Sequence, residues 1–146
     1  MNDIYNYLFL EEKLSSSGMP TAEQIKSVAD AGVDVVINLA QTTSQGALPD
    51  EGPLVESLGM KYIQIPVDWN NPTQQDLEEF FSAMDEHKEE KKLVHCQANF
   101  RATGFVTLYR VLRLGWKKED ALQDLQKIWD PAKYPVWEKF IEEHLR

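Results

Sequence analysis

The chain has a single cysteine, few basic residues and no long apolar run. Cys96 stands alone among 146 residues, so no internal disulfide can form. This scarcity fits a cytoplasmic protein in a reducing compartment, unless a signal peptide was removed before Met1. Lysine and arginine number 15 against 24 acidic residues, giving a net charge of −9. Nucleic acids and anionic membranes require clustered basic side chains, so we expect neither as a partner.

No apolar stretch approaches the roughly 20 residues that a membrane-spanning helix needs. The composition, 42% hydrophobic and 27% charged, is instead that of an ordinary globular domain. The length suffices for one hydrophobic core, and no repeat, low-complexity segment or linker divides the chain. We therefore expect residues 1–146 to form a single domain.

Short apolar runs alternate with amphipathic stretches along the chain. This alternation predicts an α/β fold, a three-layer sandwich with a mostly parallel central sheet of about four to five strands flanked by helices. An opening extended segment is expected at residues 5–14, with Ser15–Pro20 breaking it. The other expected strands lie at 33–39, 62–67 and 92–95, and the expected helices begin after Thr21, Asp50 and Thr73 and at Phe100, Ala121 and Pro135.

Three polar loops follow the predicted parallel strands. They are Gln41–Ser44, Asp68–Asn71 and Cys96–Arg101. Ligands of open α/β sheets bind outside the carboxyl ends of the strands, so we expect all three loops to share one site.

The lone cysteine stands where an apolar run ends and a helical pattern begins. Loop amides and the helix dipole converge at such a junction to make an anion site, and this field favours a thiolate. Arg101 adds a planar fork of donors suited to a tetrahedral oxyanion. The expected catalytic pair is therefore Cys96 and Arg101. The residues expected to bind the anion around them are Gln97, Ala98, Asn99, Phe100, Ala102 and Thr103.

The run from His95 to Thr103 resembles the phosphate-binding loop of the cysteine-dependent phosphatases, the tyrosine and dual-specificity superfamily. Their signature is His-Cys, five residues, Arg and then Ser or Thr. Here four residues separate Cys96 from Arg101, and Ala102 replaces the hydroxyl residue. This shorter loop is similar to that of small bacterial phosphatase-like domains, some fused to β-lactamase-like hydrolases. Asn99 occupies that group's glycine, and asparagine tolerates positive φ better than other residues with side chains.

The resemblance extends to the segments Ser17–Thr21, Val36–Leu39 and Tyr62–Val67. It implies a phosphatase-like fold and hydrolysis of a phosphate monoester through a cysteinyl-phosphate, with no cofactor. The expected partner is a phosphorylated small molecule or a phosphoprotein. Few basic residues lie near the loop, which disfavours polyphosphorylated ligands.

An aspartate is needed to protonate the leaving oxygen, and Asp68 is the candidate. It follows a strand end at the expected edge, and Trp69 beside it can exclude water. Asp76 fits a capping box, and Asp50 and Glu51 begin a helix, so these carboxylates are weaker candidates. The competing interpretation is that Asp68 only shapes a turn.

Two other functions stay open. One is a non-catalytic anion or phosphopeptide-binding module, in which Cys96 is a buried small hydrophobe. The other is sulfur transfer, because rhodaneses share the four-residue spacing, although their Gly-Gly-x-x-x-Trp turn is absent. No spacing of His, Cys, Asp or Glu suggests a metal. Alternation points His95 away from Cys96 into a structural role, and His87 and His144 are expected to be solvated.

Overall fold

The computed structural model describes residues 1–146 and contains one five-stranded sheet of order β1-β2-β5-β3-β4. The β1–β2 pair is antiparallel, and the other pairs are parallel. The strands are β1 (Leu8–Glu11), β2 (Leu14–Ser17), β3 (Val35–Asn38), β4 (Lys61–Gln64) and β5 (Lys92–His95). The helices are α1 (Ala22–Asp30), α2 (Glu51–Ser57), α3 (Gln74–Glu86), α4 (Phe100–Leu112), α5 (Lys118–Leu125), the 3₁₀ helix η1 (Pro131–Lys133) and α6 (Pro135–His144).

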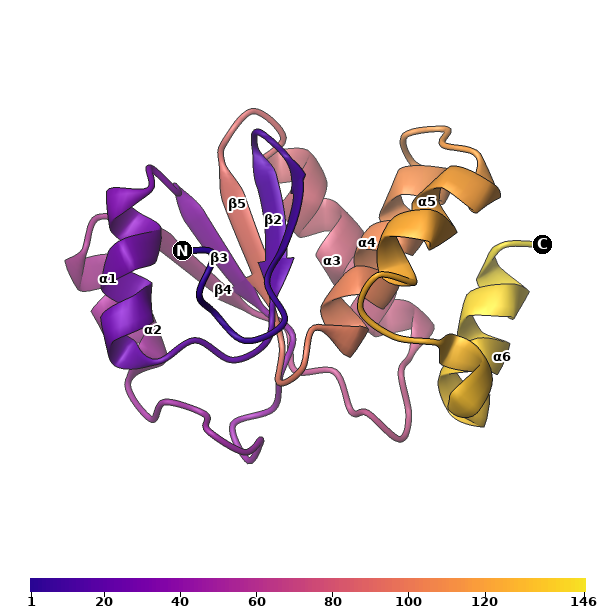
Figure 1. The fold of residues 1–146 in the computed structure, drawn as a ribbon, viewed down its shortest axis with the longest axis horizontal. Helices are drawn as coiled ribbons and strands as arrows, with labels where there is room; N and C mark the ends of the chain where they lie inside the picture. The colour runs from indigo at the N-terminus through magenta and orange to yellow at the C-terminus, as the bar shows by residue number, and fades with distance from the viewer.

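Helices cover both faces of this sheet, which confirms the predicted three-layer α/β fold (Figure 1). α1 and α2 lie on one face, and α3 to α6 lie on the other. Successive strand residues point to opposite faces, so Val36 packs in the α1–α2 core and Ile37 in the larger core on the other side. In the same way, Leu93 and Val94 of β5 pack in opposite cores. No helix is long and apolar enough to cross a membrane.

The N-terminal prediction is partly wrong. Residues 5–14 do not form one extended segment, and Ser15–Ser17 do not break it, because they belong to strand β2. β2 is buried along its whole length between β1 and β5. The small serine side chains fit this crowded position, and Ser15 Oγ lies 2.9 Å from the hydroxyl of Tyr7. Backbone pairing from both sides overrides their turn propensity.

Two predicted capping boxes are confirmed. The Thr21 hydroxyl accepts from the Gln24 amide at 3.2 Å, and the Thr73 hydroxyl accepts from the Asp76 amide at 3.1 Å. The Asp76 carboxylate in turn accepts a hydrogen bond from the Thr73 amide at 3.1 Å, so it is occupied as expected. Asp50 stands at the N-cap of α2, yet its side chain caps nothing.

The two helical histidines are less exposed than predicted. His87 is only 8% exposed because it ends α3 and packs over the following turn, with Nδ1 2.6 Å from Glu90 Oε1. This hydrogen bond, together with one from Lys61, lowers the pKa of Glu90. His144 is half-buried and lies 2.8 Å from the Phe140 carbonyl oxygen. The prediction of a solvated surface position is therefore wrong for His87 and only half right for His144.

Candidate active site

A hollow of about 320 Å³ opens over Cys96 at the carboxyl end of β5. Cys96 is fully buried. The hollow is lined by Trp69, Cys96, Gln97, Ala98, Phe100, Arg101 and Tyr134. The structure thus brings the cysteine, the arginine and much of the predicted anion loop together.

The loop after Cys96 carries a run of free donors. The backbone amides of residues 97–102 make no hydrogen bond inside the protein, while the Cys96 amide donates to the Ser17 carbonyl at 3.3 Å. Asn99 adopts the left-handed conformation, with φ of 70°, at the N-cap of α4. The expected positive φ is therefore confirmed. A left-handed residue beside a helix N-terminus is the geometry that turns successive amides toward one anion.

Thr103 lies one turn too far into α4 to join these donors. Its amide donates to the Asn99 carbonyl at 3.1 Å, and its hydroxyl donates to the same oxygen at 2.7 Å. The hydroxyl also accepts a bond from Trp129 Nε1 at 2.8 Å. The amide and the hydroxyl of Thr103 therefore both have partners within the protein, unlike the amides of residues 97–102. Ala102 is fully buried, and only its amide is free.

Arg101 connects the anion loop to the neighbouring strand. Arg101 is 5% exposed, and its Nη1 donates to the Val67 carbonyl at 2.8 Å. Nε and Nη2 make no hydrogen bond within the protein, so one edge of the fork remains available at the hollow. Arg101 is thereby fixed at the residue that precedes Asp68.

Asp68 lies at the predicted sheet edge but is exposed and does not line the hollow. Its Oδ1 accepts from the Asn70 amide at 2.9 Å, and its carbonyl accepts from the Asn71 amide at 3.0 Å. These bonds are those of an aspartate-initiated turn. The carboxylate begins a loop that borders the site, and the next residue reaches into it.

Trp69 and four further aromatic residues form a wall that the sequence did not predict as a unit. Phe100 stacks on Trp129 at 4.8 Å between ring centroids, and Tyr134 lies edge-on to Trp69 at 5.4 Å. Trp137 donates from Nε1 to the Trp69 carbonyl at 2.7 Å and anchors the Asp68 loop. Residues 129–137 come from the segment after α5, and nothing in their local sequence indicated the site.

A buried polar pair lies beneath the loop. His95 points to the opposite side from Cys96, as predicted, and its Nε2 is 2.6 Å from the Glu51 carboxylate. Its Nδ1 donates to the Cys96 carbonyl at 3.3 Å. Glu51 is 3% exposed, so it is a structural partner of the loop and not a free acid. Because Glu51 begins a helix, the sequence indicated only a residue at a helix start and did not predict this buried role.

Asn38 extends this pair to Tyr62, donating to the phenol oxygen at 3.1 Å and to Glu51 at 3.5 Å. Burial raises the pKa of Tyr62 to about 12; the bond from Asn38 opposes this rise, and the nearby Glu51 carboxylate adds to it. The surroundings of Tyr62 therefore disfavour its phenolate form.

The prediction that Gln41–Ser44 joins the site is wrong. Gln41 and Thr42 line a separate hollow of about 200 Å³ together with Tyr62 and Glu51. The loop after β3 leads into α2 (Figure 1), and none of its residues lines the hollow over Cys96.

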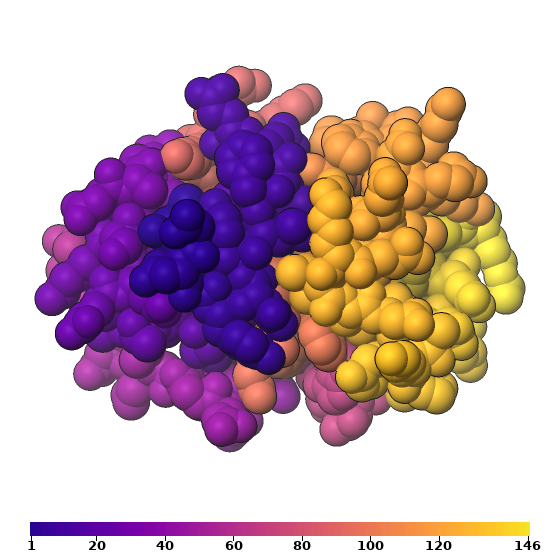
Figure 2. Space-filling view, in the orientation of Figure 1, coloured from indigo at the N-terminus to yellow at the C-terminus, as the bar shows by residue number.

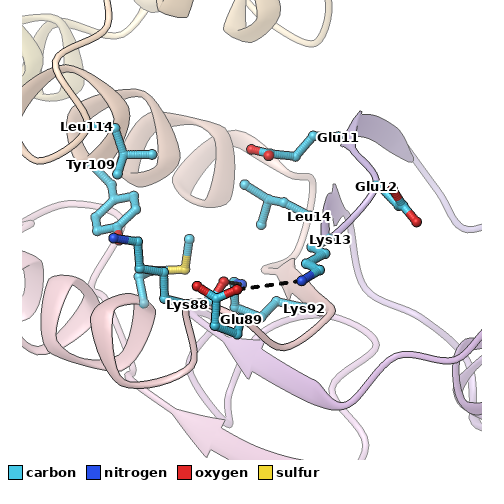
Figure 3. A pocket seen from close by; sticks show the side chains of 10 residues that line it. Glu11, Glu12, Lys13, Leu14, Lys88, Glu89, Lys92, Tyr109 and Leu114 are labelled. Carbon is cyan, nitrogen blue, oxygen red and sulfur yellow. Dashed lines mark hydrogen bonds and ion pairs between the residues drawn. The ribbon is translucent and has the colours of Figure 1, made fainter.

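A third hollow, of about 350 Å³, lies at the amino ends of β2 and β5 (Figure 3). Glu11, Glu12, Lys13, Lys88 and Glu89 surround it, and Lys13 pairs with Glu89 at 3.7 Å. The Lys92 amine donates to the carbonyls of His87, Lys88 and Glu90, and burial lowers its pKa. Mixed exposed charges and an occupied amine leave no reactive group here.

Residues 9–133 match the family model described as DSP-PTPase phosphatase fused to NAD+ Kinase. The chain belongs to this family. The match includes the Cys96 loop and Asp68, and it makes the chain a phosphatase-like domain of the cysteine-dependent class. No curated protein matches the chain.

Solved structures agree with this assignment. A DUF442 protein from Shewanella putrefaciens CN-32 is 42% identical, with a TM-score of 0.88 over 98% of this chain and 93% of that chain. Tk-PTP in its active form is 20% identical, with a TM-score of 0.79 and 96% of both chains covered. TpbA from P. aeruginosa, in complex with pTyr, is 16% identical, with a TM-score of 0.74 over 96% of this chain and 88% of that chain. The two more distant structures share the fold of this phosphatase-like domain.

Proposed function

We propose that this domain hydrolyses phosphate monoesters through a cysteinyl-phosphate intermediate. The observation that carries the proposal is the set of free amides at residues 97–102, placed with the open edge of Arg101 around Cys96. Donors fixed in advance around a developing oxyanion are commonly the largest contribution to catalysis. Cys96 is the nucleophile, the amides and Arg101 hold the phosphoryl oxygens, and Asp68 is the general acid.

In the first step the Cys96 thiolate attacks phosphorus, a P–S bond forms, and the bond to the leaving oxygen breaks. Asp68 gives its proton to that oxygen, so the product leaves as a neutral alcohol or phenol. Asp68 begins the loop that Arg101 and Trp137 anchor, and rotation about its side-chain bonds releases the carboxylate from the Asn70 amide.

In the second step water attacks the phosphorus of the cysteinyl-phosphate. The ionised Asp68 accepts a proton from the water, the P–S bond breaks, and the thiolate returns with release of inorganic phosphate. The side chain of Ala102 offers the departing sulfur no donor, so the amides of the loop are the groups that stabilise it.

The hollow fits a substrate with one phosphoryl group. Arg101 is the only cation in its lining, and the remaining side chains of the lining are mostly apolar or aromatic. A polyphosphorylated ligand needs further cations to offset its charge. Phosphorylated small molecules and phosphoproteins can both present a single phosphoryl group. TpbA provides a relative whose structure contains pTyr.

The proposal predicts turnover of p-nitrophenyl phosphate with a covalent intermediate. Acid quenching during turnover is expected to trap one phosphoryl group on the peptide that contains Cys96, because the P–S bond persists until water attacks. Mass spectrometry of the digested protein measures this adduct. Release of p-nitrophenol without any phosphorylated Cys96 peptide contradicts the mechanism.

Asp68→Asn is expected to slow phenyl phosphate cleavage far more than p-nitrophenyl phosphate cleavage. Phenolate is the poorer leaving group and depends on the proton, whereas p-nitrophenolate leaves readily as an anion. We expect the two losses in kcat/KM to differ by about tenfold or more. The matched control is Asp30→Asn, an exposed aspartate at the end of α1. Equal losses on both substrates assign the acid to another group.

A phosphopeptide or anion-binding module is the second candidate. It is favoured by the absence of any carboxylate from the lining of the hollow and by the turn bonds of Asp68. Binding of inorganic phosphate without turnover of either aryl phosphate supports this candidate over the hydrolase.

A further inference from the structure

Two asparagines far apart in the sequence each donate a side-chain hydrogen bond to the backbone of the other's segment. Asn6 and Asn99 are the only residues other than glycine with positive φ, at 51° and 70°. The Asn99 side-chain amide donates to the Asn6 carbonyl at 2.8 Å, and the Asn6 side-chain amide donates to the Ala98 carbonyl at 3.0 Å. Left-handed backbone at a residue with a side chain is strained, and it persists where surrounding contacts fix it.

Gly18 and Met19 join these two segments. The Gly18 amide donates to the Tyr5 carbonyl at 2.7 Å, and the Met19 amide donates to the Gln97 carbonyl at 2.9 Å. A Cβ on Gly18 would lie 2.8 Å from the Gln97 oxygen and 2.9 Å from the Tyr5 oxygen. Glycine is therefore required for the N-terminal turn and the anion loop to approach so closely. Figure 2 shows the N-terminal residues, in indigo, on the front of the molecule.

These bonds determine the direction of the loop amides. In a trans peptide the carbonyl and the following N–H point in opposite directions, and the chain has no cis peptide. Met19 binds the Gln97 carbonyl, so the Ala98 amide points away from the N-terminal segment. Asn6 binds the Ala98 carbonyl, and the antiparallel bridge between Gly18 and Ala98 faces the Asn99 amide toward the Ser17 carbonyl. The Ala98 amide is free, and Asn6 holds the Ala98 carbonyl.

We propose that Asn6 is a positioning residue that keeps the Ala98 carbonyl turned away from the phosphate. Asn6 lies outside residues 9–133, the part matched by the family model, and the inference rests on phosphate binding in the proposed function. Without the Asn6 donor, the Ala98–Asn99 peptide loses the bond that opposes its rotation. A rotated peptide presents the Ala98 carbonyl oxygen to the anion, which adds repulsion.

Asn6→Gly and Asn6→Asp test this role separately from backbone strain. Glycine retains access to positive φ but removes the donor, while aspartate retains the size and places a carboxylate against the Ala98 oxygen. Binding of inorganic phosphate is measured by its protection of Cys96 from iodoacetamide. The measurement is made at a temperature below the unfolding midpoint of every variant. We expect Asn6→Gly to weaken phosphate binding about tenfold and Asn6→Asp more. Asn2→Ala, at an exposed position of the same N-terminal segment, is the control and is expected to bind phosphate as wild type does.

The Asn6→Asp variant has a pH signature that a purely structural role lacks. A protonated carboxyl group donates a hydrogen bond to the Ala98 carbonyl. The phosphate affinity of Asn6→Asp, relative to wild type, is therefore expected to recover as the pH falls toward about 4. Phosphate binding within twofold of wild type in both variants, or an Asn6→Asp defect that acid does not relieve, overturns the proposal. The wild-type protein could bind phosphate but turn over no ester, with both variants binding phosphate more weakly. That result supports the role of Asn6 and contradicts the proposed phosphatase activity.

Discussion

Replacing Cys96 with serine is expected to lower kcat/KM for p-nitrophenyl phosphate by about a thousandfold or more, equivalent to about 4 kcal/mol. A serine hydroxyl is not ionised near neutral pH, and no histidine or carboxylate lines the hollow to remove its proton. The free amides and Arg101 remain in the variant, so the loss is that of the nucleophile itself. Initial rates with wild type and variant at matched concentrations measure it.

Phosphate binding provides the control for Cys96→Ser. The anion loop is unchanged, so the variant is expected to bind inorganic phosphate, detected as a change in tryptophan fluorescence because Trp69 lines the hollow. Its unfolding midpoint should also stay close to that of wild type, because sulfur and oxygen differ little in size. Substantial turnover by a folded Cys96→Ser variant would mean that the cysteine is not the nucleophile.

Arg101→Lys is expected to reduce kcat/KM by about a hundredfold, equivalent to about 2.7 kcal/mol. Lysine keeps the positive charge but loses the planar fork that bonds the Val67 carbonyl and a phosphoryl oxygen at the same time. The loss has two parts, weaker stabilisation of the transferring phosphoryl group and looser attachment of the Asp68 loop. Steady-state kinetics with an aryl phosphate measure their sum.

Arg113→Lys is the matched control for this substitution. Arg113 is half exposed and pairs with Asp85 at 2.8 Å, so its replacement should leave kcat/KM unchanged within experimental error. If Arg101→Lys also remains within about threefold of wild type, a loss under roughly 1 kcal/mol, the guanidinium does not bind the transition state.

Features encoded in adjacent residues were predictable from the sequence. The junction of strand, loop and helix at Cys96 is marked by an apolar run followed by a helical pattern, and Asn99 has the positive φ that its residue type favours. The capping boxes at Thr21 and Thr73 were also predictable because each needs only residues three positions apart. Alternation along β5 placed His95 and Cys96 on opposite sides.

Features that depend on distant partners were not predictable. Ser15–Ser17 form a strand because β1 and β5 pair with them, and Glu51 is buried because His95 meets it across 44 positions. The aromatic wall requires the segment after α5 to fold back against Trp69.

The sequence by itself determined the Cys96 loop and the layers of the fold, because these follow from short-range periodicity and local backbone preference. The tertiary structure alone decided which loops border that site. It placed Tyr134 in the hollow, Gln41 outside it and Asn6 against Ala98. These positions depend on how elements pack and which distant hydrogen bonds close, and no short segment specifies either.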